Sequence, residues 1–355
     1  MDKRGRGGLD RRSLLFSGAA LGGGALVAGC TSNKSPDDSS GNLNAAAKAG
    51  TDNDKPGKQV TIGFSAPAAD HGWMAAISKN ASAQAKQYSD VHLEVVEGTN
   101  DVNAQISQVQ TLIGKKVDIL VILPFDGKAL TAVAQQAMDA GIPVVNVDRV
   151  FDTPLAYRTW IGGDNFGMGL NAGLYIGKTL KAKGVSKPVI GEIAGIDNLE
   201  LTKQRSAGLK KGLAKYGFTV GIRQAADFTA DSGQQVMSNV LQARSHLDAV
   251  WNHDDDQGIG VEAAIKQAGR SEFFMVGGAG SKHVMQEIKA DNSVVKATVV
   301  YPSNMSASAI RLARLMAQHK AIGDLVGQDL PSSVTLYSAT VTKDNVDQYL
   351  PGAFS

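Results

Sequence analysis

The stretch Gly141-Ile142-Pro143-Val144-Val145-Asn146-Val147-Asp148-Arg149 joins a short apolar run to an acid and a base. Residues 142–147 are mostly β-branched and apolar, which is typical of a parallel strand buried on both faces. Asp148 and Arg149 follow at the carboxyl end of this strand. Ligands of open α/β sheets bind in a crevice at that end, so the charged pair is a candidate binding site. The alternative is an ordinary surface ion pair that closes the strand.

Strand and helix patterns alternate on both sides of this stretch, first in four β–α steps before Asp148 and then again after it. Such alternation predicts an α/β fold with parallel sheets covered by helices on both faces. Because the pattern restarts, we expect two Rossmann-like lobes. Strands are predicted near 60–64, 93–96, 117–123, 142–147, 189–193, 220–222, 249–251, 273–276 and 297–300, and helices near 73–88, 103–113, 130–140, 166–181 and 202–216.

The amino terminus has the pattern of an export signal. Arg11-Arg12 is a twin-arginine pair, and the apolar, glycine-rich segment after it ends in Val27-Ala28-Gly29-Cys30. Small residues directly before the only cysteine resemble a bacterial lipoprotein signal, in which Cys30 is acylated. The alternatives are a buried thiol and an ordinary cleavable signal. We therefore predict a signal peptide at 1–29 and, because 30–58 contains almost nothing apolar, a flexible tether after it.

The positive charge of the chain belongs to this signal. The chain has 36 basic and 34 acidic residues, but five of the basic and two of the acidic ones precede Cys30, which leaves 31 and 32. Net charge therefore indicates no basic face, and no nucleic-acid partner is expected. A single cysteine also excludes an internal disulfide framework.

The sequence lacks the common catalytic motifs: a Gly-x-Ser-x-Gly elbow, His-Glu-x-x-His and a phosphate-binding loop. Gly167-Met168-Gly169-Leu170-Asn171-Ala172-Gly173 resembles a dinucleotide loop, but its last spacing is one residue too long, and helix-packing glycines explain it better. His253-Asp254-Asp255-Asp256 fits a solvated loop or a polar ligand contact better than a cation site. We therefore expect neither an enzyme nor a cofactor nor a bound metal.

Several segments resemble the sugar-binding proteins of bacterial ABC importers, of the ribose-binding type. They include Asp70-His71-Gly72-Trp73, the stretch from 140 to Arg149, and Gly163-Asp164-Asn165. Further similar segments occur in the same order at 61–64, 105–106, 117–124, 204–208, 226–228, 254–255 and 297–298. The resemblance covers nearly all of residues 59–342. It implies two Rossmann-like lobes joined by a three-strand hinge and closing on one sugar.

The resemblance also implies boundaries and partners. The first lobe would comprise 59–160 plus about 302–335, and the second 161–301 plus about 336–355. The chain would cross between them near Trp160-Ile161, Tyr301-Pro302 and 336–339. We expect a monomer, held on the outer face of the cytoplasmic membrane by lipid alone, that delivers its ligand to an ABC permease with its ATPase.

Position by position, the resemblance assigns ligand contacts to both lobes. Carboxylates and guanidinium groups suit adjacent hydroxyls in charge-assisted, bidentate hydrogen bonds, and aromatic rings offer flat faces to C–H groups. The expected contacts are Asp70, His71, Trp73, Asp148 and Arg149 from the first lobe, Arg205, Phe228 and Asp254 from the second, and Tyr301 at the hinge. As alternatives, Trp73 and Phe228 would be core residues, Arg205 would pair with a helix carboxylate, and Asp70 would cap a helix.

Two departures from the ribose-type pattern bear on the ligand. The chain has Gly277-Gly278-Ala279-Gly280 where the pattern has an aspartate, and Tyr301 where it has a hinge glutamine. A ligand hydroxyl without its acceptor would lose about 1–3 kcal/mol. We therefore expect a small neutral sugar or sugar alcohol other than ribose. Rival hypotheses are a sugar sensor that acts on a chemoreceptor or sensor kinase and, less favoured, a sugar-acting enzyme.

Overall fold

The computed structural model describes residues 53–320 and 330–355. Cys30, the twin-arginine pair and most of the expected tether lie outside the described residues. Among the helices in the described part, none combines the length and the apolar character that crossing a membrane requires.

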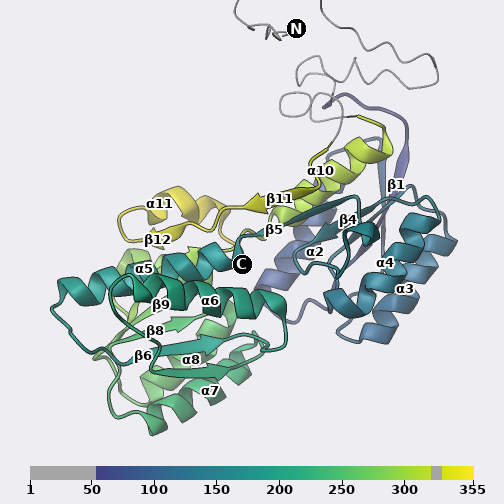
Figure 1. The fold of residues 1–355 in the computed structure, drawn as a ribbon. Helices are drawn as coiled ribbons and strands as arrows, with labels where there is room; N and C mark the ends of the chain where they lie inside the picture. The colour runs from purple at the N-terminus through teal and green to yellow at the C-terminus, as the bar shows by residue number, and fades with distance from the viewer. Residues whose placement is uncertain (1–52, 321–329) are drawn as a thin grey trace, which may run out of the picture. The chain divides into compact units, whose positions relative to one another are not determined.

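The first sheet has six parallel strands in the order β11-β5-β4-β3-β1-β2 (Figure 1). Its strands are β1 (Val60–Ser65), β2 (Val91–Val95), β3 (Ile119–Ile122), β4 (Val144–Val147), β5 (Thr159–Gly163) and β11 (Ser333–Leu336). Ile119 and Val121 of β3 face one apolar core, whereas Leu120 and Ile122 face another. Burial of both faces explains why these strands are continuous apolar runs.

Helices cover both faces of this sheet, and the sheet and its helices are called the first lobe below. They are α2 (Gly72–Ala85), α3 (Val102–Gly114), α4 (Gly127–Asp139) and α10 (Met305–Ala317), with a 3-10 turn η1 (Pro154–Ala156). Helices α2 and α10 pack together on one face, where the Ser306 hydroxyl donates to the Ile77 carbonyl at 2.7 Å. Helices α3 and α4 pack on the other face.

The second sheet has the order β12-β10-β9-β8-β6-β7, and only its edge strand β12 runs antiparallel. Its strands are β6 (Ile190–Ala194), β7 (Ile222–Ala225), β8 (Ala249–Asn252), β9 (Phe274–Ala279), β10 (Val295–Val300) and β12 (Thr340–Thr342). The predicted strand at 220–222 therefore begins later, at Ile222. With its helices this sheet forms the second lobe, so the α/β fold of two Rossmann-like lobes is confirmed.

Helices α5 and α6 lie on one face of the second sheet, and α7 and α8 pack on the other. The helices of this lobe are α5 (Asn165–Ala182), α6 (Glu200–Ala214), α7 (Ala230–Ala243), α8 (Asp255–Gln267), α9 (Lys282–Ala290) and α11 (Val346–Tyr349), followed by a 3-10 turn η2 (Leu350–Gly352). A Cβ atom on Gly169 would lie 1.9 Å from the Arg205 carbonyl oxygen, and one on Gly208 would lie 2.1 Å from that of Phe166. The glycines after Gly167 therefore allow α5 and α6 to pack closely.

The chain passes between the two sheets three times, after β5, after β10 and after β11. The crossing expected at Trp160-Ile161 lies inside β5, because this strand pairs with β11 as far as Gly163. The Asp164 amide still donates to the Leu336 carbonyl at 2.9 Å. The chain therefore leaves the first sheet at Asp164, directly before α5.

Candidate ligand-binding site

A narrow cavity lies where strand ends of both sheets meet, and its free volume is about 20 Å³. This volume is far below the range for small-molecule sites, about 300–1,000 Å³, so the walls of the cavity lie close together in this structure. Its lining comprises His71, Trp73, Met74, Asp148, Arg149, Leu201, Arg205, Phe228, Asp254, Ala279 and Tyr301. Every residue expected to contact a ligand lines this cavity except Asp70.

The carboxyl ends of the parallel strands place the lining side chains. Asp148 and Arg149 follow β4, Phe228 follows β7, Asp254 follows β8 and Ala279 ends β9. Each strand therefore brings its last residues to the same edge of its sheet, where open α/β sheets bind ligands. A wider hollow adjoins the cavity and shares Asp148, Arg149 and Leu201 with it.

Three lining residues have strained backbones. Asp148, Phe228 and Ala279 have φ angles of 60°, 73° and 82°, in the region that residues with side chains rarely adopt. Such conformations cost about 1–3 kcal/mol each and persist where the surrounding structure enforces them, often at ligand clamps. Their convergence on one cavity supports a binding role for it.

Tyr301 connects the two lobes through a buried hydrogen-bond network. Its hydroxyl donates to Asp148 Oδ1 and accepts from Asn165 Nδ2 at 3.0 Å. Burial, together with Asp148, raises the pKa of Tyr301 well above its ordinary value, so the hydroxyl keeps its proton. The Trp73 ring nitrogen donates to the Tyr301 carbonyl at 3.0 Å. Tyr301 therefore occupies Oδ1 of Asp148 and leaves Oδ2 as the oxygen that can accept from a ligand.

Arg205 is held by the second lobe and does not pair with a helix carboxylate. Its Nε donates to Asn165 Oδ1 at 2.9 Å and its Nη1 donates to the His253 carbonyl at 3.1 Å. Its guanidinium carbon lies 4.6 Å from the centre of the Tyr301 ring and 5.8 Å from that of Phe228. These contacts fix a positive charge in the cavity wall.

Arg149 has an unsatisfied donor in the same cavity. Its Nη1 donates to the Phe125 carbonyl at 2.5 Å, but its buried Nε has no hydrogen-bond partner and lies 4.0 Å from Asp148 Oδ2. A buried donor without a partner costs about 1–3 kcal/mol. A ligand oxygen that accepts from Nε would remove this penalty.

The run Asp254-Asp255-Asp256 serves three separate purposes. Asp254 lines the cavity and caps α8 by accepting from the amides of Asp256 and Gln257 at 2.9 and 3.2 Å. Burial, reinforced by Asp256, raises the pKa of Asp254 to about 6. Asp255 accepts from the amide of Gly278 at 2.7 Å, which anchors the end of β9, where Ala279 lies. The run is therefore not a solvated loop, because all three carboxylates accept hydrogen bonds from backbone amides.

Asp256 makes an interlobe contact that sequence reasoning missed. Its Oδ2 accepts from the Trp73 amide at 2.8 Å, at the beginning of α2 in the first lobe. The N-cap residue of α2 is His71, whose side chain makes no capping bond. The carboxylate at this helix start therefore comes from the other lobe, and not from Asp70 as the alternative had it.

Asp70, expected as a ligand contact, lies outside the cavity and is exposed. Its carboxylate binds His71 Nδ1 at 2.5 Å and accepts from Asn100 Nδ2 at 2.7 Å. The His71 ring stacks on Phe228 with 6.4 Å between the ring centres. In this structure Asp70 acts on the cavity by orienting His71.

The aromatic residues have more than one role. Trp73 is 5% exposed and belongs to the apolar core, as the alternative had it, but it also lines the cavity. Phe228 is buried to the same degree and lines the cavity. Met74, Leu201 and Ala279 are further lining residues. Ala279 stood out as a departure from the ribose-type pattern, whereas Met74 and Leu201 carried no sequence signal.

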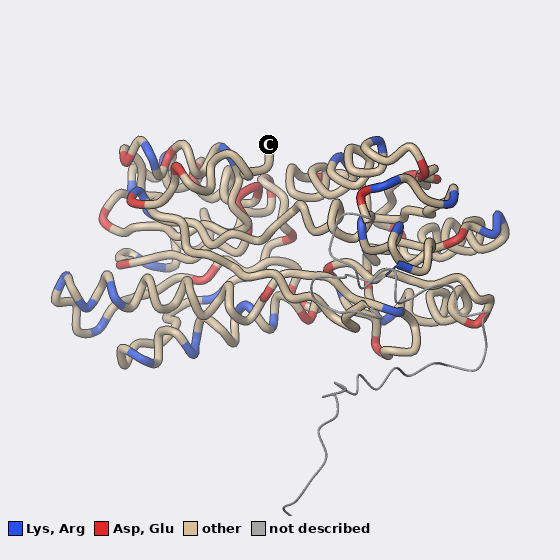
Figure 2. Tube along the Cα trace, turned by 90° about the horizontal axis from the view of Figure 1, so that it is seen from above, with Lys and Arg blue, Asp and Glu red and all other residues tan. Residues whose placement is uncertain are grey.

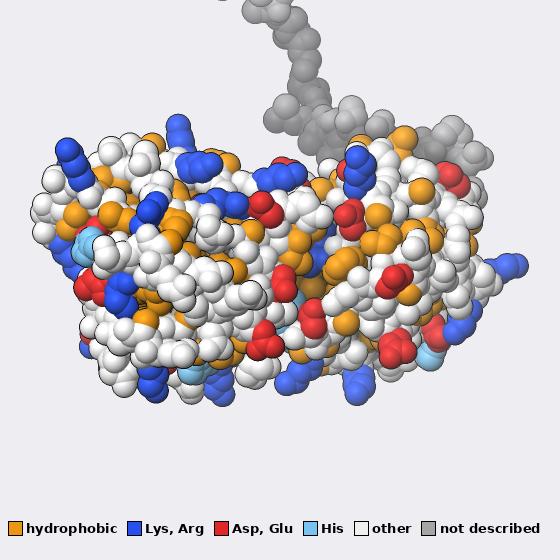
Figure 3. Space-filling model, turned by 90° about the horizontal axis from the view of Figure 1, so that it is seen from below, with side chains coloured by type: hydrophobic (Ala, Val, Ile, Leu, Met, Phe, Trp, Pro, Cys, Tyr) orange, Lys and Arg blue, Asp and Glu red, His pale blue; other side chains and the backbone are white. Residues whose placement is uncertain are grey.

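Charged side chains of both signs are dispersed over the surface. Figure 2 shows lysine and arginine positions interspersed with aspartate and glutamate positions along both lobes, and Figure 3 shows side chains of both signs on one face. This distribution fits the nearly balanced charge that remains beyond Cys30.

The fold and the site define a class of two-lobe binding proteins, and comparisons identify the family. The sequence profile of the periplasmic binding protein domain matches residues 62–321. The chain therefore belongs to the periplasmic binding protein family.

Individual relatives are sugar-binding and polyol-binding proteins by name. A ribose import binding protein of Bacillus subtilis is 30% identical over 232 residues, which span 65% of this chain and 73% of that protein. A xylitol-binding protein of Mycolicibacterium smegmatis is 26% identical over 262 residues, spanning 73% and 71% of the two chains. A crystal structure from Mycobacterium smegmatis, in complex with β-D-fucofuranose, has a TM-score of 0.74 at 25% identity and covers 82% of this chain and 94% of that one.

Proposed function

We propose that this chain is the extracytoplasmic solute-binding lipoprotein of an ABC importer and binds a small neutral sugar or sugar alcohol in the cavity between its lobes. The observation that carries the proposal is the unpartnered Arg149 Nε beside Asp148 in a small buried cavity. These groups offer a donor and an acceptor about 4.0 Å apart, which suits neighbouring ligand hydroxyls.

The charges of the cavity favour a neutral ligand. Asp148 and Asp254 face Arg149 and Arg205, so the acidic and basic groups balance. A charged ligand would leave one of these buried groups without compensation, which is costly in a desolvated site. A polyhydroxyl compound carries donors and acceptors without net charge, and the rings of Trp73, His71 and Phe228 can cover its C–H surfaces.

Two residues argue against ribose itself. Tyr301 engages one oxygen of Asp148, and Ala279 contributes a methyl group where the ribose-type pattern has a carboxylate. Fewer acceptors remain for ligand hydroxyls, so we expect a ligand of different shape or fewer ring hydroxyls. The names of the relatives, which include a xylitol binder and a ribose binder, are consistent with a pentose-sized sugar or its alcohol.

Transport would use closure of the lobes about the three crossings. Ligand contacts come from both lobes, so binding favours the closed state, and the permease with its ATPase would recognise that state. We propose export by the twin-arginine signal and anchoring on the outer face of the cytoplasmic membrane through lipid on Cys30. A monomer suffices, because one chain supplies all lining residues of the cavity.

A melting-temperature screen tests the proposal. The purified chain would be mixed with pentoses, hexoses, sugar alcohols, amino acids and metal ions, and incubated with candidate sugars to detect turnover. A ligand at one hundred times its dissociation constant stabilises a protein by about 2.7 kcal/mol, which is visible as a higher melting temperature. A shift with one sugar or polyol and no turnover supports the proposal. No shift with any carbohydrate contradicts it.

A sensor would bind its ligand in the same cavity, so the protein that co-purifies with this chain distinguishes a sensor from a transport protein. Incorporation of labelled palmitate at Cys30 and co-purification with an ABC permease are the expected results. Co-purification with a chemoreceptor or sensor kinase in place of a permease would assign the sensor role.

A further inference from the structure

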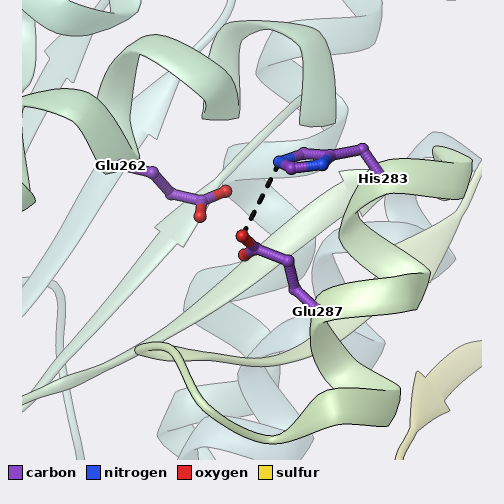
Figure 4. A group of neighbouring side chains, drawn as sticks. All are labelled: Glu262, His283 and Glu287. Atoms are coloured by element: carbon purple, nitrogen blue, oxygen red, sulfur yellow. Dashed lines mark ion pairs between the residues drawn. The ribbon is translucent and has the colours of Figure 1, made fainter.

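Glu262, His283 and Glu287 form a compact group of side chains on the second lobe, away from the cavity (Figure 4). Glu262 belongs to α8, and His283 and Glu287 lie one turn apart on α9. Figure 4 shows the two carboxylates facing each other with the imidazole ring beside them. One ligating atom from each residue lies within 4.8 Å of the other two.

The hydrogen bonds within the protein leave this group incompletely satisfied. Glu262 Oε1 is buried and has no hydrogen-bond partner. Glu287 Oε2 accepts from the Ser293 hydroxyl at 3.2 Å, while its Oε1 lies 3.7 Å from His283 Nε2, which is too long for a hydrogen bond. The group therefore has a vacant acceptor at its centre.

Two of the three residues present carboxyl groups to each other at close range. Such a pair holds either a shared proton or a cation between its oxygens. A divalent cation would displace the proton and bind both carboxylates, and the imidazole would complete a mixed oxygen and nitrogen ligand set.

We propose that Glu262, His283 and Glu287 bind a divalent transition-metal ion of the zinc type. Carboxylate and imidazole donors suit Zn²⁺ and Co²⁺, whereas Ca²⁺ and Mg²⁺ take oxygen ligands. Metal–ligand distances of about 2.0–2.2 Å require the three ligating atoms to approach one another. The side chains can do this, because that of His283 is 57% exposed and that of Glu287 is 25% exposed.

The metal ion would join two helices that leave the cavity. Helix α8 begins beside Asp254, and α9 begins shortly after Ala279, the last residue of β9. An ion held between Glu262 and the two α9 residues would tie these helices together at a distance from the ligand. We therefore infer a structural metal site that stabilises the second lobe.

Metal titration of the full chain, purified in detergent and stripped with a chelator, tests the site. Isothermal titration with Zn²⁺ should show one saturable site, and Co²⁺ should give a visible absorption spectrum of a low-coordinate complex. Glu262→Gln and His283→Ala should each weaken this site at least tenfold. The matched control is His246→Ala. His246 also lies beside a carboxylate, Asp248 at 3.2 Å, but it is not one of the three residues of the proposed site.

Melting temperatures of the variants show whether a loss of metal binding reflects the loss of a ligand or a failure to fold. Glu262→Gln replaces one of the two facing carboxyl groups by a neutral amide of the same shape, so without metal this variant should melt no lower than the parent protein. Zn²⁺ should raise the melting temperature of the parent and of His246→Ala but not of the two site variants. Absence of saturable binding, or equal binding by parent and site variants, would overturn the proposal.

Discussion

The first-lobe wall of the cavity contains a buried donor that has no hydrogen-bond partner, whereas each charged side chain of the second-lobe wall makes two hydrogen bonds within its own lobe. Arg149 Nε has no partner, and only one oxygen of Asp148 is engaged by Tyr301. In contrast, Arg205 donates to Asn165 and His253, and Asp254 caps α8. From this difference we propose that the first lobe mainly recognises ligand hydroxyls and that the second mainly provides a rigid wall.

The largest expected effect is on ligand affinity at Asp148. Asp148→Ala should weaken binding of the ligand found in the melting screen by more than about 2 kcal/mol, because it removes a buried charged acceptor and leaves Arg149 unpaired. Isothermal titration measures the loss. Asp152→Ala is the control, since Asp152 is an exposed residue four positions along the same loop. Unchanged affinity in Asp148→Ala would make this carboxylate purely structural.

The next comparison is between the stabilities of variants at Arg205, in the second lobe, and at Arg149, in the first. We expect the substitution of Arg205 to lower the free energy of unfolding more. Arg205→Met leaves Asn165 Oδ1 and the His253 carbonyl without their donor, so the free energy of unfolding should fall by about 2 kcal/mol. Arg149→Met should lower it by less, because this change removes one hydrogen bond, to the Phe125 carbonyl, together with an Nε that had no partner. Urea unfolding without ligand compares the two variants. Equal losses would remove the contrast between the walls.

Tyr301→Phe tests the connection between the walls. The change removes the hydroxyl that joins Asp148 to Asn165, so we expect a loss of about 1 kcal/mol in the free energy of unfolding. It also frees Asp148 Oδ1 for a ligand hydroxyl. The melting screen should then show relatively larger shifts with sugars that carry an additional hydroxyl, and an unaltered ligand ranking would count against this role.

The smallest expected effect concerns pH and Asp254. Its folded-state pKa is raised to about 6 from 3.8, so the stability linked to its proton is fully present below pH 4 and is lost as the pH rises through 6. The other charged groups that act on Asp254 are Asp256, His71 and Arg205.

Asp254→Asn keeps an oxygen that can cap α8 but carries no charge. At pH 7.5 this variant should gain roughly 1 kcal/mol or more over the parent protein, and at pH 4 the gain should disappear. Melting curves across this range make the comparison. A gain that is equal at both pH values would show that the proton on Asp254 is not responsible.

The charged pair Asp148-Arg149 at the end of β4 shows what can be predicted from local sequence patterns. An apolar run that ends in charged residues gives the strand, its burial and the edge of the sheet at which the charges lie, because these follow from local periodicity and strand polarity. Phe228 and Asp254 were assigned by the resemblance to ribose-type sugar-binding proteins, and the structure places them after the ends of β7 and β8. Local periodicity failed for β5 (Thr159–Gly163), because Trp160 and Ile161 are its only large apolar residues and two glycines follow them.

Asp70 and Asp256 show where such reasoning stops. Both are aspartates near a helix start, and the sequence favoured Asp70 because it precedes α2 directly. The structure places Asp70 against His71 and Asn100, and brings Asp256 from the other lobe to the Trp73 amide. Two residues 183 positions apart meet only through the packing of the lobes.

The sequence by itself determined two α/β lobes, the strand ends that carry the charged residues, and the family, because apolar periodicity and short motifs are local properties of the chain. The tertiary structure decided which polar atoms are satisfied: Tyr301 on Asp148, Asn165 on Arg205, and the open Nε of Arg149. It also brought Glu262 to His283 and Glu287, although the one-turn spacing of the last two was visible in the sequence. Hydrogen-bond partners depend on distances between remote segments, and those distances exist only once the chain has folded.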